Sequence, residues 1–169
     1  MAMPVCCIAK DDHPALSFAR SLSYHYLMSH SKNQSGGCLC GAVRYEVEGP
    51  LRGVVNCYCS MCQRLHGASG AHSKADKSRI SIVEGRGLKW FASSDQARRG
   101  FCSECGSNLF WEPVDQPGMG IVAGSLDQPT HLATIGHIFV AEKADFVEIT
   151  GDAPQFAGSS HGKIEGDEL

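Results

Sequence analysis

Short apolar runs separated by glycine and other turn residues dominate the chain from about residue 36 onward. Val43, Tyr45 and Val47 are apolar and alternate with Arg44 and Glu46, which is the two-residue period of a strand with one buried face. Comparable runs are ISIVEG (80–85), LKWFAS (88–93), SNLFWEP (107–113), GIVAG (120–124), HIFVAE (137–142) and DFVEITG (145–151). Many short strands joined by turns predict a mainly β fold made of small sheets.

The same pattern divides the chain into three parts. Residues 1–35 show no clear period and predict an N-terminal tail, although 14–28 (PALSFARSLSYHYLM) has the spacing of a short helix. Residues 36–158 carry the strand-like runs and predict a single domain, with a brief helix starting near Ser60 and running through MCQRLHG. Residues 159–169 (SSHGKIEGDEL) are polar and predict a frayed C-terminal tail.

The composition of the chain argues against nucleic acid and membranes as partners. The 169 residues carry a formal net charge of −3, which gives no electrostatic case for binding nucleic acid or an anionic membrane. No stretch approaches the ~20 apolar residues of a membrane span. The first residues, MAMPVCCIAKDDHP, lack the charged and apolar regions of a secretory signal, which predicts a cytoplasmic protein. The final Gly-Asp-Glu-Leu is interpreted as a chance likeness to a retention signal.

The chain has nine cysteines, a count high enough to need a chemical explanation. A disulfide scaffold is opposed by the odd number and by the expected reducing compartment. Adjacent Cys6 and Cys7 are interpreted as incidental thiols of the tail. The other seven form close groups typical of metal binding: Cys38, Cys40, Cys57, Cys59, Cys62, Cys102 and Cys105.

Zinc binding requires four ligands in a tetrahedron, and thiolates are its usual structural ligands. Cys38-x-Cys40 and Cys102-x-x-Cys105 are both followed by glycine, which lets the backbone wrap around a metal, so together they would form a closed site. Three cysteines then remain: Cys57, Cys59 and Cys62. Three ligands and a vacancy are typical of catalytic zinc.

The spacing leaves this assignment of cysteines to sites open. Either His66 or His72 is a candidate fourth ligand of the second site, although an open position is favoured. Iron–sulfur clusters also use sets of four cysteines and are a rival interpretation. A thioredoxin-like redox pair is a weaker one, because no βαβ pattern surrounds either C-x-x-C.

Three motifs, taken together, resemble the glutathione-dependent formaldehyde-activating enzyme family, also called the GFA/CENP-V domain. They are GCLCGAVRY (37–45), CYCSMCQR (57–64) and FCSECGSNL (101–109), in that order. Weaker likeness continues through GSLD (124–127), HIFV (137–140), KA (143–144), EI (148–149) and PQF (154–156), so that the resemblance covers about residues 36–157.

The resemblance implies a β-tent fold, with small sheets packed around two zinc ions per chain. It implies structural zinc on Cys38, Cys40, Cys102 and Cys105. It implies a second, catalytic zinc on Cys57, Cys59 and Cys62. It also implies a carbon–sulfur lyase activity like that of S-(hydroxymethyl)glutathione synthase, with glutathione as co-substrate and formaldehyde or another small aldehyde as partner.

Several polar residues are candidates for substrate contact. Arg64 follows the Cys57–Cys62 motif and is the first candidate for a glutathione carboxylate, with a solvated basic face as the plainer interpretation. Further candidates with weaker claims are Lys74, Lys77, Arg79, Ser60, Gln63 and Asn108. The large aromatic residues are expected in the core or a pocket wall: Trp90, Phe91, Phe110 and Trp111.

Two other function classes stay open. A zinc-stabilised module that binds a thiol or aldehyde without catalysis would share every motif above. A structural or chromatin-associated zinc domain would also share the cysteines, but the chain has no basic, low-complexity arm to favour it.

Overall fold

The computed structural model describes residues 33–166. The predictions for most of the N-terminal segment, including the helix over 14–28 and the thiols Cys6 and Cys7, lie outside these residues. The strands are β1 (Gln34–Gly37), β2 (Arg44–Val47), β3 (Val54–Cys57), β4 (Gly70–Asp76), β5 (Ile80–Glu84), β6 (Leu88–Ser94), β7 (Ala97–Cys102), β8 (Asn108–Pro113), β9 (Gly118–Val122) and β10 (Thr134–Ile138). The helices are α1 (Ser60–His66) and three 3-10 turns, η1 (Lys77–Arg79), η2 (Ala123–Ser125) and η3 (Val140–Glu142).

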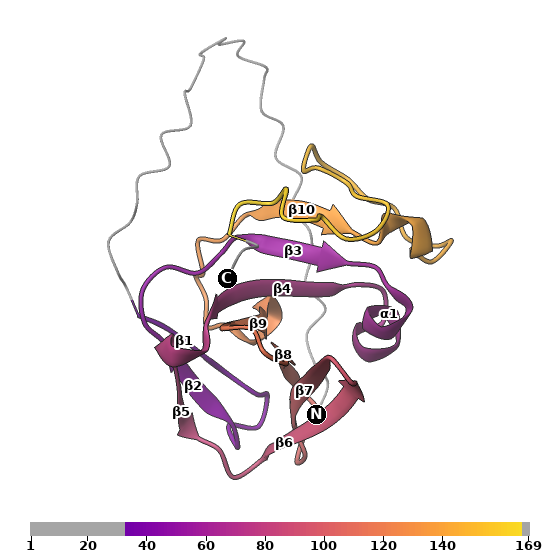
Figure 1. The fold of residues 1–169 in the computed structure, drawn as a ribbon. Helices are drawn as coiled ribbons and strands as arrows, with labels where there is room; N and C mark the ends of the chain where they lie inside the picture. The colour runs from indigo at the N-terminus through magenta and orange to yellow at the C-terminus, as the bar shows by residue number, and fades with distance from the viewer. Residues whose placement is uncertain (1–32, 167–169) are drawn as a thin grey trace, which may run out of the picture.

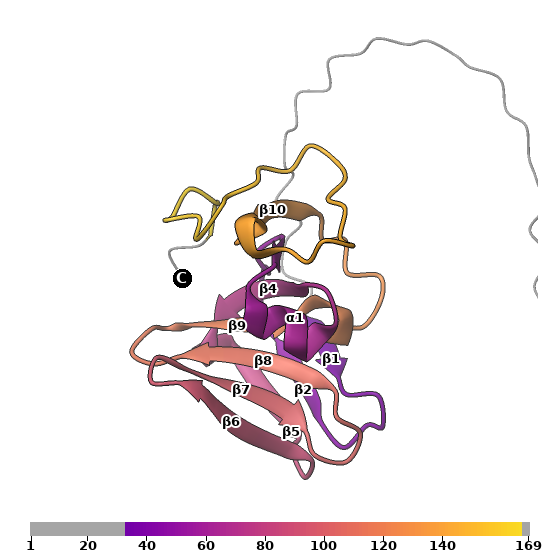
Figure 2. The same cartoon turned by 90° about the vertical axis from the view of Figure 1, so that its right-hand side faces the viewer.

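These strands form two sheets. A three-stranded sheet has the order β1-β2-β5, and a seven-stranded sheet has the order β10-β3-β4-β9-β8-β7-β6 (Figure 1). Neighbouring strands are antiparallel except β10 and β3, which run parallel. Helix α1 lies at the end of β3, to one side of the larger sheet (Figure 2). The mainly β architecture predicted from the sequence is therefore confirmed.

The apolar core lies between the two sheets. Tyr45 and Val47 of β2 are 1% and 0% exposed, whereas Glu46 between them faces solvent, as their alternation predicts. They pack in one cluster with residues of β8 and β9, among them Phe110, whose ring meets the Tyr45 ring edge-on at 4.9 Å. A Cβ atom at Gly36 would lie 2.4 Å from the Tyr45 side chain, so only glycine lets β1 approach this ring.

Some segments differ from the sequence-based expectation. The run 137–142 leaves the sheet at Ile138, because Phe139 has a φ of 55° and turns the chain into η3. The run 145–151 forms no strand, and Phe146 within it is 72% exposed. Helix α1 begins at Ser60 as predicted. Within residues 33–166, no helix has the length and apolar character needed to cross a membrane.

The polar segment from residue 159 packs on the domain as far as the structure describes it. Ile164 is 3% exposed and Ser160 is 4% exposed. The Ile164 side chain approaches β10 so closely that a Cβ atom at Gly136 would lie 2.6 Å from its Cδ1 atom. This differs from the frayed tail that the polarity of 159–169 suggests, since one buried isoleucine anchors the segment.

Replacing Ile164 by alanine is therefore expected to lower the free energy of unfolding by about 2 to 4 kcal/mol, because a buried side chain is truncated. Denaturant unfolding of the variant against wild type measures the change. Glu165→Ala, at an exposed neighbouring position, is the control and should change stability little. Equal stability of Ile164→Ala and wild type would show that the segment does not pack on β10.

Candidate metal centres

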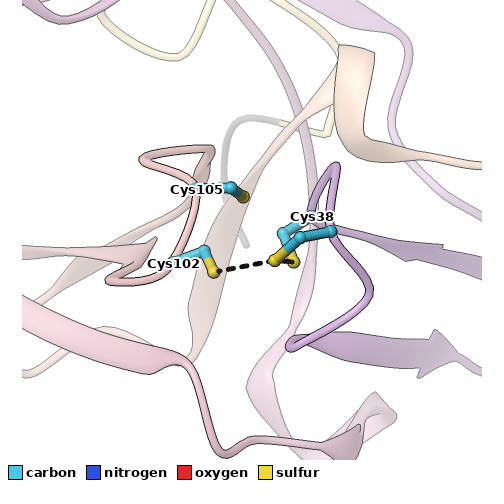
Figure 3. Close-up of side chains that lie close together, drawn as sticks. Cys38, Cys102 and Cys105 are labelled. Carbon is cyan, nitrogen blue, oxygen red and sulfur yellow. Dashed lines mark hydrogen bonds between the residues drawn. The ribbon is translucent and has the colours of Figure 1, made fainter.

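Four of the predicted ligands meet where two turns face each other. Cys38 and Cys40 lie in the turn after β1. Cys102 is the last residue of β7, and Cys105 lies in the turn that follows it (Figure 3). Each turn closes through a glycine with positive φ, namely Gly41 at 80° and Gly106 at 77°. Because non-glycine residues rarely adopt this conformation, the glycines let each short loop present two sulfurs to the same point.

The spacing of these sulfurs fits a single tetrahedral metal ion. All four Sγ atoms lie within 4.8 Å of one another, and those of Cys38 and Cys40 are 3.6 Å apart. The Sγ atoms of Cys40 and Cys102 are 3.8 Å apart. A zinc–sulfur bond of about 2.3 Å in a regular tetrahedron gives a sulfur–sulfur distance of about 3.8 Å. No disulfide joins any cysteine within residues 33–166.

The acid–base properties of this cluster also point to a cation. Hydrogen bonds from Ser107 lower the pKa of the Cys105 thiol to about 5. The pKa of the Cys40 thiol rises to about 12. A hydrogen bond from the Ala42 backbone N–H lowers this pKa, but burial and the other three cysteines of the cluster raise it by more. Opposed shifts among neighbouring thiols mean that the cluster resists full ionisation by itself. A divalent cation at its centre would remove that resistance.

This cluster joins the two sheets. Cys38 and Cys102 belong to the apolar core, at 8% and 0% exposure. The Leu39 N–H donates a hydrogen bond of 3.1 Å to Ser107 Oγ, which links one turn to the other. The backbone N–H of Val43 donates to Cys38 Sγ at 3.2 Å, a contact that stabilises a negative sulfur. A metal here would hold together segments that are more than sixty residues apart in the chain.

The second cluster lies where β3 passes into α1. Cys57 ends the strand, Cys59 precedes the first residue of the helix and Cys62 lies in its first turn. Their three sulfurs lie within 4.8 Å of one another. Among residues 33–166, no further histidine, cysteine or carboxylate offers a ligand atom within that distance of all three. His66 and His72, the candidate fourth ligands, instead pair with each other at a ring distance of 5.3 Å.

Hydrogen bonds hold the cysteine-bearing segment in place. Gln63 donates from Nε2 to the carbonyl of Tyr58 at 2.6 Å and to the carbonyl of Glu142 at 2.7 Å. The Glu142 carboxylate accepts from the Ser60 backbone N–H at 3.1 Å. Asn108 donates to the carbonyl of Leu65, near the end of α1. Gln63 and Asn108, predicted as possible substrate contacts, therefore support the backbone that carries the three sulfurs.

Charge is unevenly distributed within this second cluster. The hydrogen bond with Cys57 and, to a lesser extent, the contacts with Cys59 and Arg99 lower the pKa of the Cys62 thiol to about 6, despite its burial. The same hydrogen bond, together with burial, raises the pKa of Cys57. As in the first cluster, three sulfurs this close hold their full negative charge only beside a positive one.

The remaining predicted contacts are mostly occupied elsewhere. Lys77 forms an ion pair with Glu112 at 3.2 Å, and Arg79 donates to the carbonyls of Glu48 and Pro50. Lys74 is buried at 7% exposure, and Arg64 is exposed on the last turn of α1.

The aromatic residues divide between core and surface. Phe110 belongs to the core, and Trp90 stacks on it with ring centroids 6.0 Å apart. Phe91, on the edge strand β6, is 58% exposed, which differs from the expected core position. Adjacent residues of a strand point to opposite faces, so Phe91 points away from the face on which its neighbour Trp90 packs against Phe110.

Arg99 is the residue near the second cluster that the sequence analysis missed. It lies in β7, is 7% exposed and interacts with the Cys62 sulfur. The signal was present in the strand ARRGFC (97–102): one of its two adjacent arginines must share a face with Ala97 and Phe101. That arginine is Arg99, while Arg98 lies 4.4 Å over the Trp90 ring and pairs with Glu112 on the other face.

The fold is mainly β and carries two cysteine clusters that could each hold a metal ion, one with four thiols and one with three. The chain belongs to the family described as glutathione-dependent formaldehyde-activating enzyme, which matches residues 33–142. The resemblance found in the motifs is thereby confirmed. A Halomonas elongata protein named "Putative glutathione-dependent formaldehyde-activating enzyme" is 29% identical over 127 residues, which cover 68% of this chain and 79% of that protein.

A solved structure is also similar. The crystal structure of a Rhodobacter sphaeroides protein is 23% identical in sequence, with a TM-score of 0.48. The alignment covers 72% of this chain and 98% of that chain.

The first centre is expected to contribute directly to folding. Replacing Cys38 by serine should remove one bound metal ion per chain and lower the melting temperature strongly, because a structural metal site carries folding energy. Elemental analysis and thermal unfolding measure the two effects. Leu39→Ala is the matched control, since it lies in the same turn and is 89% exposed. Unchanged metal content in Cys38→Ser would rule out this cluster as a metal site.

Proposed function

We propose that this chain is a zinc enzyme that makes or breaks the carbon–sulfur bond between formaldehyde, or another small aldehyde, and glutathione or a similar thiol. One observation carries the proposal: Cys57, Cys59 and Cys62 converge without a fourth protein ligand among residues 33–166. A closed structural site has no reason to lack a ligand, whereas a site that exchanges a ligand needs the vacancy. Membership of the family supports this choice over a purely structural zinc domain.

The donor sets favour zinc as the metal, with one ion in each cluster. Cys38, Cys40, Cys102 and Cys105 offer four thiolates at separations suited to one ion, and such spacing leaves no room for the several irons and sulfides of a cluster. Cys57, Cys59 and Cys62 offer three. We assign the structural ion to the first set and the catalytic ion to the second.

Thiol activation is the chemical task of such a site. A free thiol of pKa about 8.5 is only a few per cent ionised at pH 7, and the thiolate is the form that attacks. Zinc with an open coordination position supplies deprotonation of a bound thiol. Because this gain is roughly tenfold to fiftyfold at most, and bound thiolate is less nucleophilic, positioning must contribute the rest.

In the synthetic direction, the thiolate sulfur attacks the carbonyl carbon of formaldehyde. A carbon–sulfur bond forms, the carbonyl π pair moves to oxygen, and this oxygen takes up a proton to give the hydroxymethyl thioether. The reverse reaction, breakage of that bond, corresponds to a carbon–sulfur lyase. The protein's role is to hold Cys57, Cys59 and Cys62 in fixed positions, which Gln63 and Glu142 do by tying α1 to the segment after β10.

The proposal extends to the second substrate and the compartment. Arg64 is exposed on α1, two residues after Cys62, where a glutathione carboxylate can reach it from solvent.

The cysteines at every described position are unpaired, which suits a reducing compartment such as the cytoplasm. The partner is then a small thiol with its aldehyde, and the net charge of −3 gives no basis for nucleic acid.

Replacing Cys59 by serine should abolish catalysed exchange between formaldehyde and glutathione and lower the metal content by one ion per chain. The fold should persist, because the first cluster still joins the sheets. NMR exchange spectroscopy measures the rate above the spontaneous reaction, and elemental analysis measures the metal. Met61→Ala is the control in the same segment, since this side chain is 45% exposed. Wild-type exchange no faster than the spontaneous rate would favour the non-catalytic binding module.

His66→Ala tests whether the vacancy is real. Because His66 lies outside the three-sulfur cluster, its loss should leave two metal ions bound per chain. Elemental analysis of this variant beside Cys59→Ser gives the comparison. Should His66→Ala empty the second centre, that centre is closed by histidine and the enzyme proposal fails.

A further inference from the structure

Arg99 is a buried cation beside the three-cysteine cluster. Its position in β7 leaves it 7% exposed, in contrast to Arg98, whose side chain is 51% exposed on the other face of the strand. A buried guanidinium is costly unless an anion and hydrogen-bond acceptors compensate it. The group that compensates the charge of Arg99 therefore indicates the role of this residue.

No carboxylate supplies that counter-charge. Among residues 33–166, Arg99 forms no ion pair, and its Nε atom is buried without a hydrogen-bond partner. Its guanidinium lies close enough to Cys62 to contribute, after Cys57 and Cys59, to the lowered pKa of that thiol. An arginine paired with a carboxylate would form an ordinary structural ion pair. Arg99 instead lies near the thiols of the three-cysteine cluster.

The other titratable groups around Arg99 are histidines. His66 and His72 are both held toward their neutral forms, since burial lowers the pKa of each and the nearby positive charge of Arg99 adds to the effect. The pKa of His72 falls to about 4. Arg99 is thus a buried, permanent positive charge near the cysteines of this centre, because a guanidinium does not lose its proton in proteins.

Resting on the proposed function, we propose that Arg99 is a positioning residue that offsets the negative charge of the substrate thiolate at the Cys57–Cys59–Cys62 centre. Three thiolates and a divalent ion carry one net negative charge, and a substrate thiolate adds a second. In a partly buried site this repulsion opposes binding far more than it would in water. Arg99 reduces this repulsion from a buried position, whereas the charge of Arg64 is exposed to solvent and is screened by it.

Arg99 then acts on the charged sulfur of the bound thiol and not on the other groups of that ligand. Glutathione carries carboxylates, whereas 2-mercaptoethanol has none. If Arg99 acts on the sulfur, its removal weakens both ligands by a similar factor. If it instead binds a carboxylate, its removal weakens glutathione alone.

The test uses full-length protein loaded with cobalt(II), whose absorption changes when an additional thiolate becomes a ligand. Each thiol is titrated into wild type, Arg99→Met, Arg99→Lys and Arg98→Met. Arg99→Met should keep both metal ions and bind both thiols more weakly by roughly tenfold or more, the loss expected for a charge-assisted contact. Arg99→Lys should restore much of the affinity, and Arg98→Met, the matched change on the same strand, should bind like wild type.

Each contrary outcome has a distinct meaning. Wild type whose cobalt spectrum does not respond to either thiol would overturn the proposed open site, and this inference with it. If the wild-type spectrum responds and Arg99→Met binds each thiol as tightly as wild type does, only the inference is overturned. Selective loss of glutathione binding, or loss of metal in both Arg99→Met and Arg99→Lys, would also overturn it in favour of a carboxylate contact or a structural role.

Discussion

The structure depends on the mutual repulsion of sulfur atoms that the fold forces together. Two turns and a strand–helix junction bring seven thiols into two groups with separations below 4.8 Å. Ionised alone, each group would push itself apart; with a cation at its centre, the same geometry becomes attractive. Whether the sulfurs of a group repel one another or are held together would therefore depend on a bound cation.

A metal ion in the first cluster would contribute stability that a larger apolar core would otherwise supply. The described apolar cluster contains only a few large side chains, among them Tyr45, Leu109 and Ile121, and two cysteines of the centre are part of it. A small domain with two sheets buries limited apolar surface, so a cross-link between the sheets contributes where packing cannot. The second cluster has a different setting: it lies at the start of α1, which is held by a hydrogen bond that Gln63 donates and by one that the Glu142 carboxylate accepts.

The sequence predicted those features whose signals are local. The cysteine turns with their glycines, the start of α1 and the alternation in β2 each follow from a few neighbouring residues. Strands β3, β4 and β7 were not predicted, because glycine and polar residues there conceal the period and long-range pairing decides. Ile164 was missed because Gly136, against which it packs, lies far away in the chain. Arg99 was missed because β7 itself was not predicted, so the alternation of its two arginines was not considered.

Strand β7 carries a residue beside each of the two cysteine clusters. Cys102, at the end of the strand, belongs to the first cluster, while Arg99, three residues earlier, lies near the second. The pairing of β7 with β8 shifts register between Gly100 and Phe101, in the stretch that separates these two residues. A one-residue slip turns every side chain of a strand to the opposite face, so the spacing of these four residues decides whether one strand can present both side chains correctly. An insertion or deletion between Arg99 and Cys102 would therefore displace the cysteine of one cluster or the arginine of the other, although it would remove neither residue.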